Sequence, residues 1–153
     1  MLTKVRGRFT DVAGEVRIAE DPADSHVSVR IGMASVSSGA PDRDDHLRSA
    51  DFFDVERFPE ATFESSAVRW QGRRAVVVGD LTIVGVSRPV ELSVELVGTT
   101  VDPWGGQRAI YSAWTEVDRE DWGLTWNMAL EAGGLLVSKK IRIELEVETV
   151  RQP

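Results

Sequence analysis

The residues of this chain that could carry acid–base chemistry or hold a metal are concentrated in one short stretch, DRDDHLRSADFFD. Its histidine, His46, is one of two in the sequence, and charged side chains surround it: Arg43, Asp44, Asp45 and Arg48. A zinc site normally takes three or four protein ligands, with nitrogen or sulfur among them. Because the chain has no cysteine and His26 lies in a different segment, we expect no metal at this stretch.

The same stretch could instead serve as an acid–base site. His46 paired with Asp44 or Asp54 could act as a general base, but no G-x-S-x-G elbow or comparable nucleophile motif accompanies it. Asp51 and Asp54 flank two phenylalanines, and paired carboxylates act as acid and base only where a pocket shifts one pKa. The other interpretation is a short helical turn whose charges pair with neighbours or cap backbone groups, and we favour it.

Other motifs that could contact an anion also have simpler interpretations. The segments DPWGGQ and EAGG carry glycines but lack the G-x-x-x-x-G-K-[ST] pattern of a phosphate loop, so we expect hairpin turns. Lys139 and Lys140 could attract an anionic headgroup, or they could be the solvated start of a strand. The formal net charge of −7 repels a phosphate backbone, which argues against nucleic-acid binding.

Strands must position these residues, because the dominant hydrophobic period is two. Val90–Leu96, Ile141–Val147 and Val27–Met33 each alternate apolar with polar or small residues, which is typical of half-buried antiparallel strands. Short helical turns are expected at Asp42–Ala50 and near Leu124–Leu130. Shorter candidate strands are Gly14–Ala19, Ala61–Arg69, Ala75–Val84 and Ala109–Asp118.

The apolar faces of these strands must share one interior, since their other faces are strongly charged. Glycine, proline and aspartate separate strand units of about 8–12 residues, the spacing of a barrel or sandwich. A sheet closed on itself buries one face and removes its edges. We therefore predict a single all-β domain over residues 1–153, an antiparallel barrel whose interior is either filled by side chains or open to one small ligand.

The tryptophans leave this last choice open. The segment DWGLTWNMAL brings Trp122 and Trp126 together with Leu124, Met128 and Leu130. Aromatic and methionine side chains can line a lipid pocket, because they adapt to an irregular apolar guest. The same side chains also make ordinary cores.

Several segments, taken in order, resemble the YceI-like family of polyisoprenoid-binding proteins. The most specific are RDDHLRSADFFD, from Arg43 to Asp54, and GDLTIVGVSRPV, from Gly79 to Val90. The segments VRGRF, DPWGG and DREDWGLTWN match as well. The resemblance implies an antiparallel lipocalin-like barrel of about eight strands, with short helical turns. It further implies that an elongated apolar pore holds a long isoprenoid lipid, such as a polyprenyl phosphate or a quinone, without catalysis and without a cofactor.

Under this resemblance the expected ligand-binding residues are mostly aromatic and aliphatic. The apolar ones are Phe52, Phe53, Phe58, Phe63, Leu81, Ile83, Trp114, Trp122, Leu124, Trp126 and Met128. Arg43 and His46 are assigned a weak role at the lipid headgroup. We expect selectivity to come from the length and width of the pore.

The chain departs from the family pattern at its start, because relatives usually begin with a further strand ahead of the segment that matches VRGRF. Without that strand one barrel edge would be exposed, and a second copy could pair with it to form a homodimer. No apolar run approaches the roughly 20 residues that span a bilayer. No signal peptide is visible either, so we expect a cytoplasmic location.

Two other functions stay open on the sequence alone. One is a small enzyme that acts on an apolar substrate through His46 and a neighbouring aspartate. The other is a structural or stress-protective module that binds a partner protein through its exposed strand edge.

Overall fold

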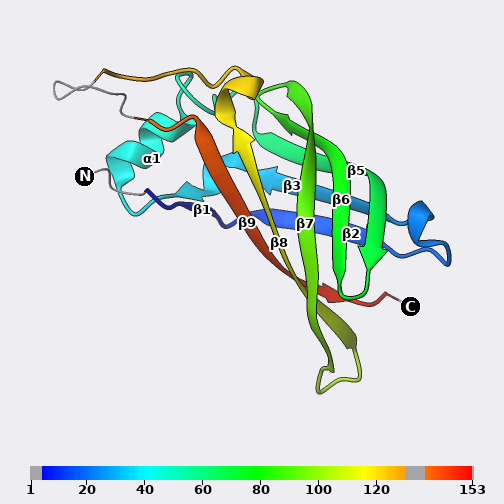
Figure 1. Cartoon of the computed structure of the whole chain (residues 1–153). Coiled ribbons are helices and arrows are strands. Elements are labelled where there is room, and N and C mark those ends of the chain that lie inside the picture. The colour runs from blue at the N-terminus through cyan, green and yellow to red at the C-terminus, as the bar shows by residue number, and fades with distance from the viewer. Residues whose placement is uncertain (1–4, 130–136, 153) are drawn as a thin grey trace.

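The computed structural model describes residues 5–129 and 137–152 and contains a long antiparallel sheet that curls around one of its faces (Figure 1). Seven strands pair in the order β2-β3-β5-β6-β7-β8-β9, and each neighbouring pair is antiparallel. Their bounds are β2 (Val12–Arg17), β3 (His26–Gly32), β5 (Glu60–Gln71), β6 (Arg74–Ile83), β7 (Val86–Val101), β8 (Gln107–Asp118) and β9 (Lys140–Val150). The predicted all-β antiparallel fold is confirmed.

The sheet forms a half-barrel rather than a closed barrel. Strands β2 and β9 are its two ends, and within residues 5–129 and 137–152 no ladder joins them. The main sheet therefore has seven of the eight strands expected from the resemblance. Among the described residues, β2 and β9 each have one neighbouring strand in this sheet.

A small two-stranded sheet and a helix lie at one end of the half-barrel (Figure 1). Strand β1 (Arg8–Phe9) pairs with β4 (Val36–Ser37), and helix α1 (Pro41–Arg48) follows. Pro41 occupies the start of α1, where a missing N–H is tolerated. The helical turn expected at Asp42–Ala50 corresponds to α1. Single 3-10 turns are η1 (Pro22–Asp24), η2 (Met33–Ser35) and η3 (Arg119–Trp122).

The second expected helical turn is misplaced. Residues 124–128 have no helical structure, and the turn forms earlier, as η3. The side chain of Asp118 caps η3 by accepting a hydrogen bond from the Glu120 amide, and Gly123 ends it in a left-handed conformation with φ 77°. Leu130, the last residue of the expected turn, lies outside the described residues.

The core fills only one end of the inner face of the sheet. It consists of the buried residues Phe63, Val68, Val77, Leu81, Val90, Trp122 and Leu124. Cross-strand pairing explains why these residues meet, because Phe63 lies opposite Leu81 and Val68 lies opposite Val77. The indole of Trp122 donates to the Leu81 carbonyl over 2.8 Å, which fixes η3 across this end of the sheet.

Candidate functional site

The remainder of the inner face carries apolar side chains in continuous cross-strand rows. One row runs through Trp70, Ala75, Val94, Ala113 and Leu145, which are direct partners on five successive strands. Paired residues of antiparallel strands project from the same face. The rows therefore merge into one apolar surface on the concave side of the half-barrel.

We call this surface the concave face and define it by eight residues. They are Trp70, Leu92, Val94, Leu96, Tyr111, Ile143, Leu145 and Val147. Trp70 is exposed and the other seven are half-buried, and three of these, Leu92, Val94 and Ile143, pack against the core. Side chains thus fill the interior at the end covered by η3, while along β7 to β9 the same inner face still reaches solvent.

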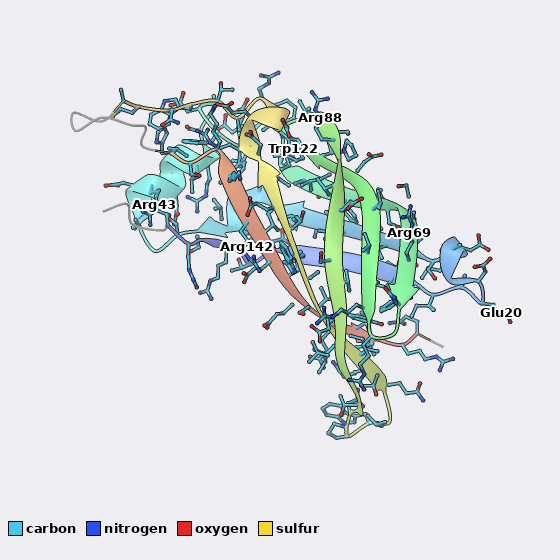
Figure 2. All side chains as sticks on the ribbon, viewed as in Figure 1. Glu20, Arg43, Arg69, Arg88, Trp122 and Arg142 are labelled. Carbon is cyan, nitrogen blue, oxygen red and sulfur yellow. The ribbon has the colours of Figure 1, made fainter. Side chains whose placement is uncertain are left out.

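Several residues expected to bind a ligand lie at the filled end. Phe63, Leu81, Trp122 and Leu124 are buried in the core, and Phe53 and Ile83 pack against it. Figure 2 shows Trp122 beside Arg88 at this end of the sheet, where Arg88 donates to the carbonyl of Asp121. These residues close the end of the concave face.

Phe58 and Phe52 lie in separate surroundings. The ring of Phe58 packs so closely on Gly85 that a Cβ there would stand 2.9 Å from it, and the guanidinium of Arg57 lies over the ring, 5.1 Å from its centroid. Phe52 forms an aromatic cluster with His46 and Trp126, with ring centroids 4.5–5.3 Å apart. The four phenylalanines are therefore not in one place: Phe63 and Phe53 are in or against the core, Phe58 packs on Gly85, and Phe52 packs with His46 and Trp126.

Trp114 was expected to line the interior, and the register places it on the outer face instead. Its cross-strand partners are Ser93 and Glu144, both exposed, and Trp114 itself is 44% exposed. The guanidinium of Arg142 stacks over it at 4.5 Å. Because side chains alternate along a strand, the inward positions of β8 belong to the neighbours of Trp114.

Met128 is also not part of a packed interior. Its side chain is exposed, in the segment that follows η3. Its amide donates to the side chain of Asn127, whose amide group also bridges to the backbone of Val137. Asn127 thus ties this segment to the start of the last strand.

The charged stretch that includes Arg43 and Asp44 holds the chain around α1 in place. Asp44 is buried and accepts hydrogen bonds from the amide and hydroxyl of Ser38, and these bonds hold the pKa of its carboxyl below the ordinary value. Arg43 donates to the hydroxyl and carbonyl of Ser38, and Arg48 donates to the carbonyls of Ala34 and Val36. Both arginines are engaged with the protein itself.

His46 does not pair with the aspartates expected of a general base. Its Nε2 lies 2.9 Å from Asp51, whereas Asp44 faces Ser38 and Asp54 pairs with Arg57 at 3.5 Å. The His46–Asp51 pair is on the surface, beside the aromatic cluster. The proposed partnership of His46 with Asp44 or Asp54 is therefore wrong, because those carboxylates point to other elements.

The sequence analysis missed a second histidine cluster between β3 and β5. His26 lies 2.8 Å from Glu64 and 3.3 Å from the hydroxyl of Ser65, a set of groups reminiscent of a hydrolase triad. Ser65 is buried, however, and its hydroxyl accepts the amide of Val27 at 2.8 Å. The cluster therefore fixes the pairing of two strands beside a bulge, and its serine is not presented to a substrate.

Arg119 is the other residue that the sequence analysis missed. It is buried, and its guanidinium donates to the carbonyls of Leu124, Trp126, Val137 and Ser138. It anchors the segment that carries Trp122 and Trp126. A charged residue at the start of a tryptophan-rich loop was the only signal in the sequence.

Within the described residues no three His, Cys, Asp or Glu side chains converge in a way that could hold a metal ion. The same residues include no helix that is both long and apolar enough to cross a membrane.

Comparison with known proteins places these features in a family. The YceI-like domain model matches residues 1–149. A UPF0312 protein of Photorhabdus laumondii is 39% identical over 147 residues, which cover 95% of this chain and 73% of that protein. Protein YceI of Salmonella arizonae is 36% identical over 147 residues, which cover 95% of this chain and 74% of that protein. Neither name states an enzymatic activity.

A solved structure agrees with the fold. The crystal structure of a Campylobacter jejuni YceI protein superposes with a TM-score of 0.86 at 26% identity, covering 100% of this chain and 88% of that one. The sequence match and the shared curled antiparallel sheet agree, and the chain belongs to the YceI-like domain family.

Proposed function

We propose that this protein binds and carries a long isoprenoid lipid, of the polyprenyl phosphate or quinone kind, along the concave face, and that it does so without catalysis. The observation that supports the proposal is the exposure of that face. Two rows, Val94–Ala113–Leu145 and Leu96–Tyr111–Val147, are apolar or aromatic across β7, β8 and β9, and their large side chains still reach solvent in part. Soluble proteins rarely leave a contiguous apolar surface without an occupant.

The size of the hydrophobic effect is sufficient for such binding. Burial of one methylene-sized group is worth about 0.8 kcal/mol, so about ten such groups contribute roughly 8 kcal/mol. That free energy corresponds to a dissociation constant of about 1 μM. A longer chain gains more contact but also loses more conformational freedom on ordering. The face therefore needs no charged anchor to retain its guest.

The geometry of Arg43 supports selectivity by shape rather than by headgroup charge. Its guanidinium donates twice to Ser38, so binding a phosphate would require breaking those bonds. His46 lies at the rim beside Phe52 and Trp126 and is the better placed of the two for a weak headgroup contact. Exchange of His46 for Ala should leave lipid retention nearly unchanged, whereas an enzyme that used His46 would lose its turnover.

A matched pair of variants on β7 tests the proposal. Val94 projects into the concave face, and Ser93 projects from the outer face one residue away. Val94→Glu should abolish retention of added polyprenyl phosphate or long-chain quinone, because the charge would be buried against the lipid. Ser93→Glu should retain it. Native mass spectrometry and organic extraction report the bound lipid, and circular dichroism checks folding.

Leu145→Ser on β9 provides a second, milder test at the same row should Val94→Glu fail to fold. Equal lipid retention by the inner-face and outer-face variants would contradict the proposal. So would a wild-type protein that takes up neither lipid.

We also propose that the chain can pair with a second copy of itself. Both end strands of the sheet, β2 and β9, present unpaired backbone groups among the described residues. Such edges template pairing with another strand. Light scattering over a range of concentrations should detect a dimer, and a mass that stays monomeric at all concentrations would exclude this part of the proposal.

A further inference from the structure

The hairpin that joins β7 to β8 extends beyond the rest of the sheet and ends in an exposed tryptophan. The first residue of β6, Arg74, pairs with Glu95, so β7 continues past β6 from there to Val101 (Figure 1). This extension of about five residues reaches roughly 17 Å beyond the β5–β6 turn. Trp104 at its tip is 86% exposed and Val101 is 65% exposed.

The turn at the tip is built so that its polar groups are satisfied internally. One carboxylate oxygen of Asp102 accepts the amides of Trp104 and Gly106 over 2.9 and 2.8 Å. The other accepts from Arg108 over 3.0 Å, and the Asp102 side chain is only 11% exposed. These bonds hold the pKa of Asp102 below its ordinary value, so it remains an anion paired with Arg108.

The result is a tip that presents apolar groups, with its acidic side chain paired to Arg108. The chain as a whole carries a formal charge of −7, yet the acidic group of this turn is neutralised and turned inward. What projects is an indole ring, with a valine and a proline beside it. An indole combines a large apolar area with one polar N–H, the combination that places tryptophan at the boundary between lipid and water.

We propose that the β7–β8 hairpin docks the protein on a phospholipid bilayer by inserting Trp104 into the interfacial region. A bilayer fits the shape of the tip, because a single convex ring at the end of a projecting hairpin is suited to insertion rather than to receiving a partner's side chain. Arg151 lies beside the first residue of β8, where its guanidinium donates to the side chain of Gln107 over 3.0 Å. A long arginine stem there can keep its charge at headgroup depth.

The docking would also orient the proposed lipid-binding surface. Tyr111, on the concave face, lies on β8 four residues from its first residue, Gln107. Tyr111 pairs with Leu96, so the apolar rows begin at the base of the projecting hairpin, on the two strands that carry the tip. A role of this docking in lipid transfer rests on the proposed function. The docking itself is independent of that function.

The test is flotation of the 153-residue chain with phosphatidylcholine vesicles. Trp104→Ala should lower the partition coefficient about tenfold or more, since burial of a large apolar side chain is worth at least that factor. The matched control is Trp114→Ala, which removes an exposed ring from the outer face and should bind like the wild type. Trp104→Tyr should recover most of the binding. Raising the salt concentration to about 0.5 M should have little effect, because the contact is apolar.

A spectroscopic measurement identifies the inserted residue. Vesicles with brominated acyl chains should quench the fluorescence of the wild type and of Trp114→Ala, and should quench Trp104→Ala far less. Trp104 is exposed, so its replacement should leave the melting curve unchanged.

Two results would overturn the inference: a wild-type chain that does not float with vesicles, or a Trp104→Ala variant whose partition coefficient is within twofold of the wild type. Self-association that depends on Trp104 without vesicle binding would assign the tip to contact with a second copy instead. Val94→Glu should keep vesicle binding while losing the guest lipid. Its behaviour therefore separates a failure of docking from a failure of the proposed function.

Discussion

Replacement of Arg119 by Met should destabilise this protein strongly, although Arg119 has no carboxylate partner among its hydrogen bonds. Its guanidinium donates to four backbone carbonyls, at Leu124, Trp126, Val137 and Ser138. The residue is buried at the end of the sheet where Trp122 covers the core. A methionine fills similar volume but supplies none of these donors.

The size of the stability loss depends on whether those carbonyls find other hydrogen-bond donors. A hydrogen bond from a charged donor contributes about 1.5–3 kcal/mol, and a buried acceptor left without a partner costs about 1–3 kcal/mol. Only the hydrogen bond to Leu124 is fully buried, the other three are partly buried so that their carbonyls can regain water, and Asn127 also donates to Val137. We therefore expect a loss of about 3–5 kcal/mol, and Arg119→Lys should recover only a minor part because one ammonium cannot reach all four oxygens.

Urea unfolding measures the effect directly. With a slope of about 2 kcal/mol/M, the expected loss lowers the midpoint by about 1.5–2.5 M. The control is Arg142→Met, since Arg142 is exposed, pairs with Glu144 and stacks over the exposed ring of Trp114. That change should cost less than about 1 kcal/mol. If Arg119→Met costs no more than Arg142→Met, the carbonyls do not depend on the guanidinium and our account of this loop is wrong.

Two further predictions concern the sheet and α1. Gly79→Ala should cost about 1–3 kcal/mol, because the new Cβ would stand 2.6 Å from Cζ of Phe63. Gly98→Ala, which meets no atom within 4 Å, should lie within about 0.5 kcal/mol of the wild type in thermal melts. The pKa of Asp44 is lowered by Ser38, so the stability from its ionised form is fully present above its ordinary pKa of 3.8 and is lost as the pH falls through the folded-state pKa. The free energy of unfolding of Asp44→Asn should therefore fall less steeply below pH 4 than that of the wild type. The same dependence on acid pH in both proteins would refute this assignment.

Much of the fold could be predicted from the sequence, because strand formation depends on a local pattern. The alternation in Val90–Leu96 and Ile141–Val147 corresponds to the two-faced strands β7 and β9, with their glutamates outward. The turn between β6 and β7 follows from the Val-Gly pair at positions 84 and 85, although Val84 adopts a positive φ of 47°, which is unusual for a β-branched residue. Membership of the family could likewise be predicted from segments such as RDDHLRSADFFD and GDLTIVGVSRPV, which occur in the family's order.

The candidate site was predicted less well, and the misplaced residues show why. Trp114 was chosen for its type, yet its position relative to Ala113 and Thr115 assigns it to the outer face. Application of the period-two rule to β8 would have found this from the sequence, and would have found Tyr111. Arg119 could not have been found this way, because its partners come from two segments joined only in the folded chain.

The sequence by itself determined the antiparallel class, the charged outer face, the apolar inner face and the family, since each depends on residue order over short distances. Only the tertiary structure decided which end of the inner face is filled by Phe63 and Trp122, and which part stays open along β7 to β9. It also decided that Arg43 and Asp44 are engaged with Ser38 rather than presented to a ligand. These outcomes depend on how far the sheet curls and on contacts between distant segments. No local pattern of residues contains that information.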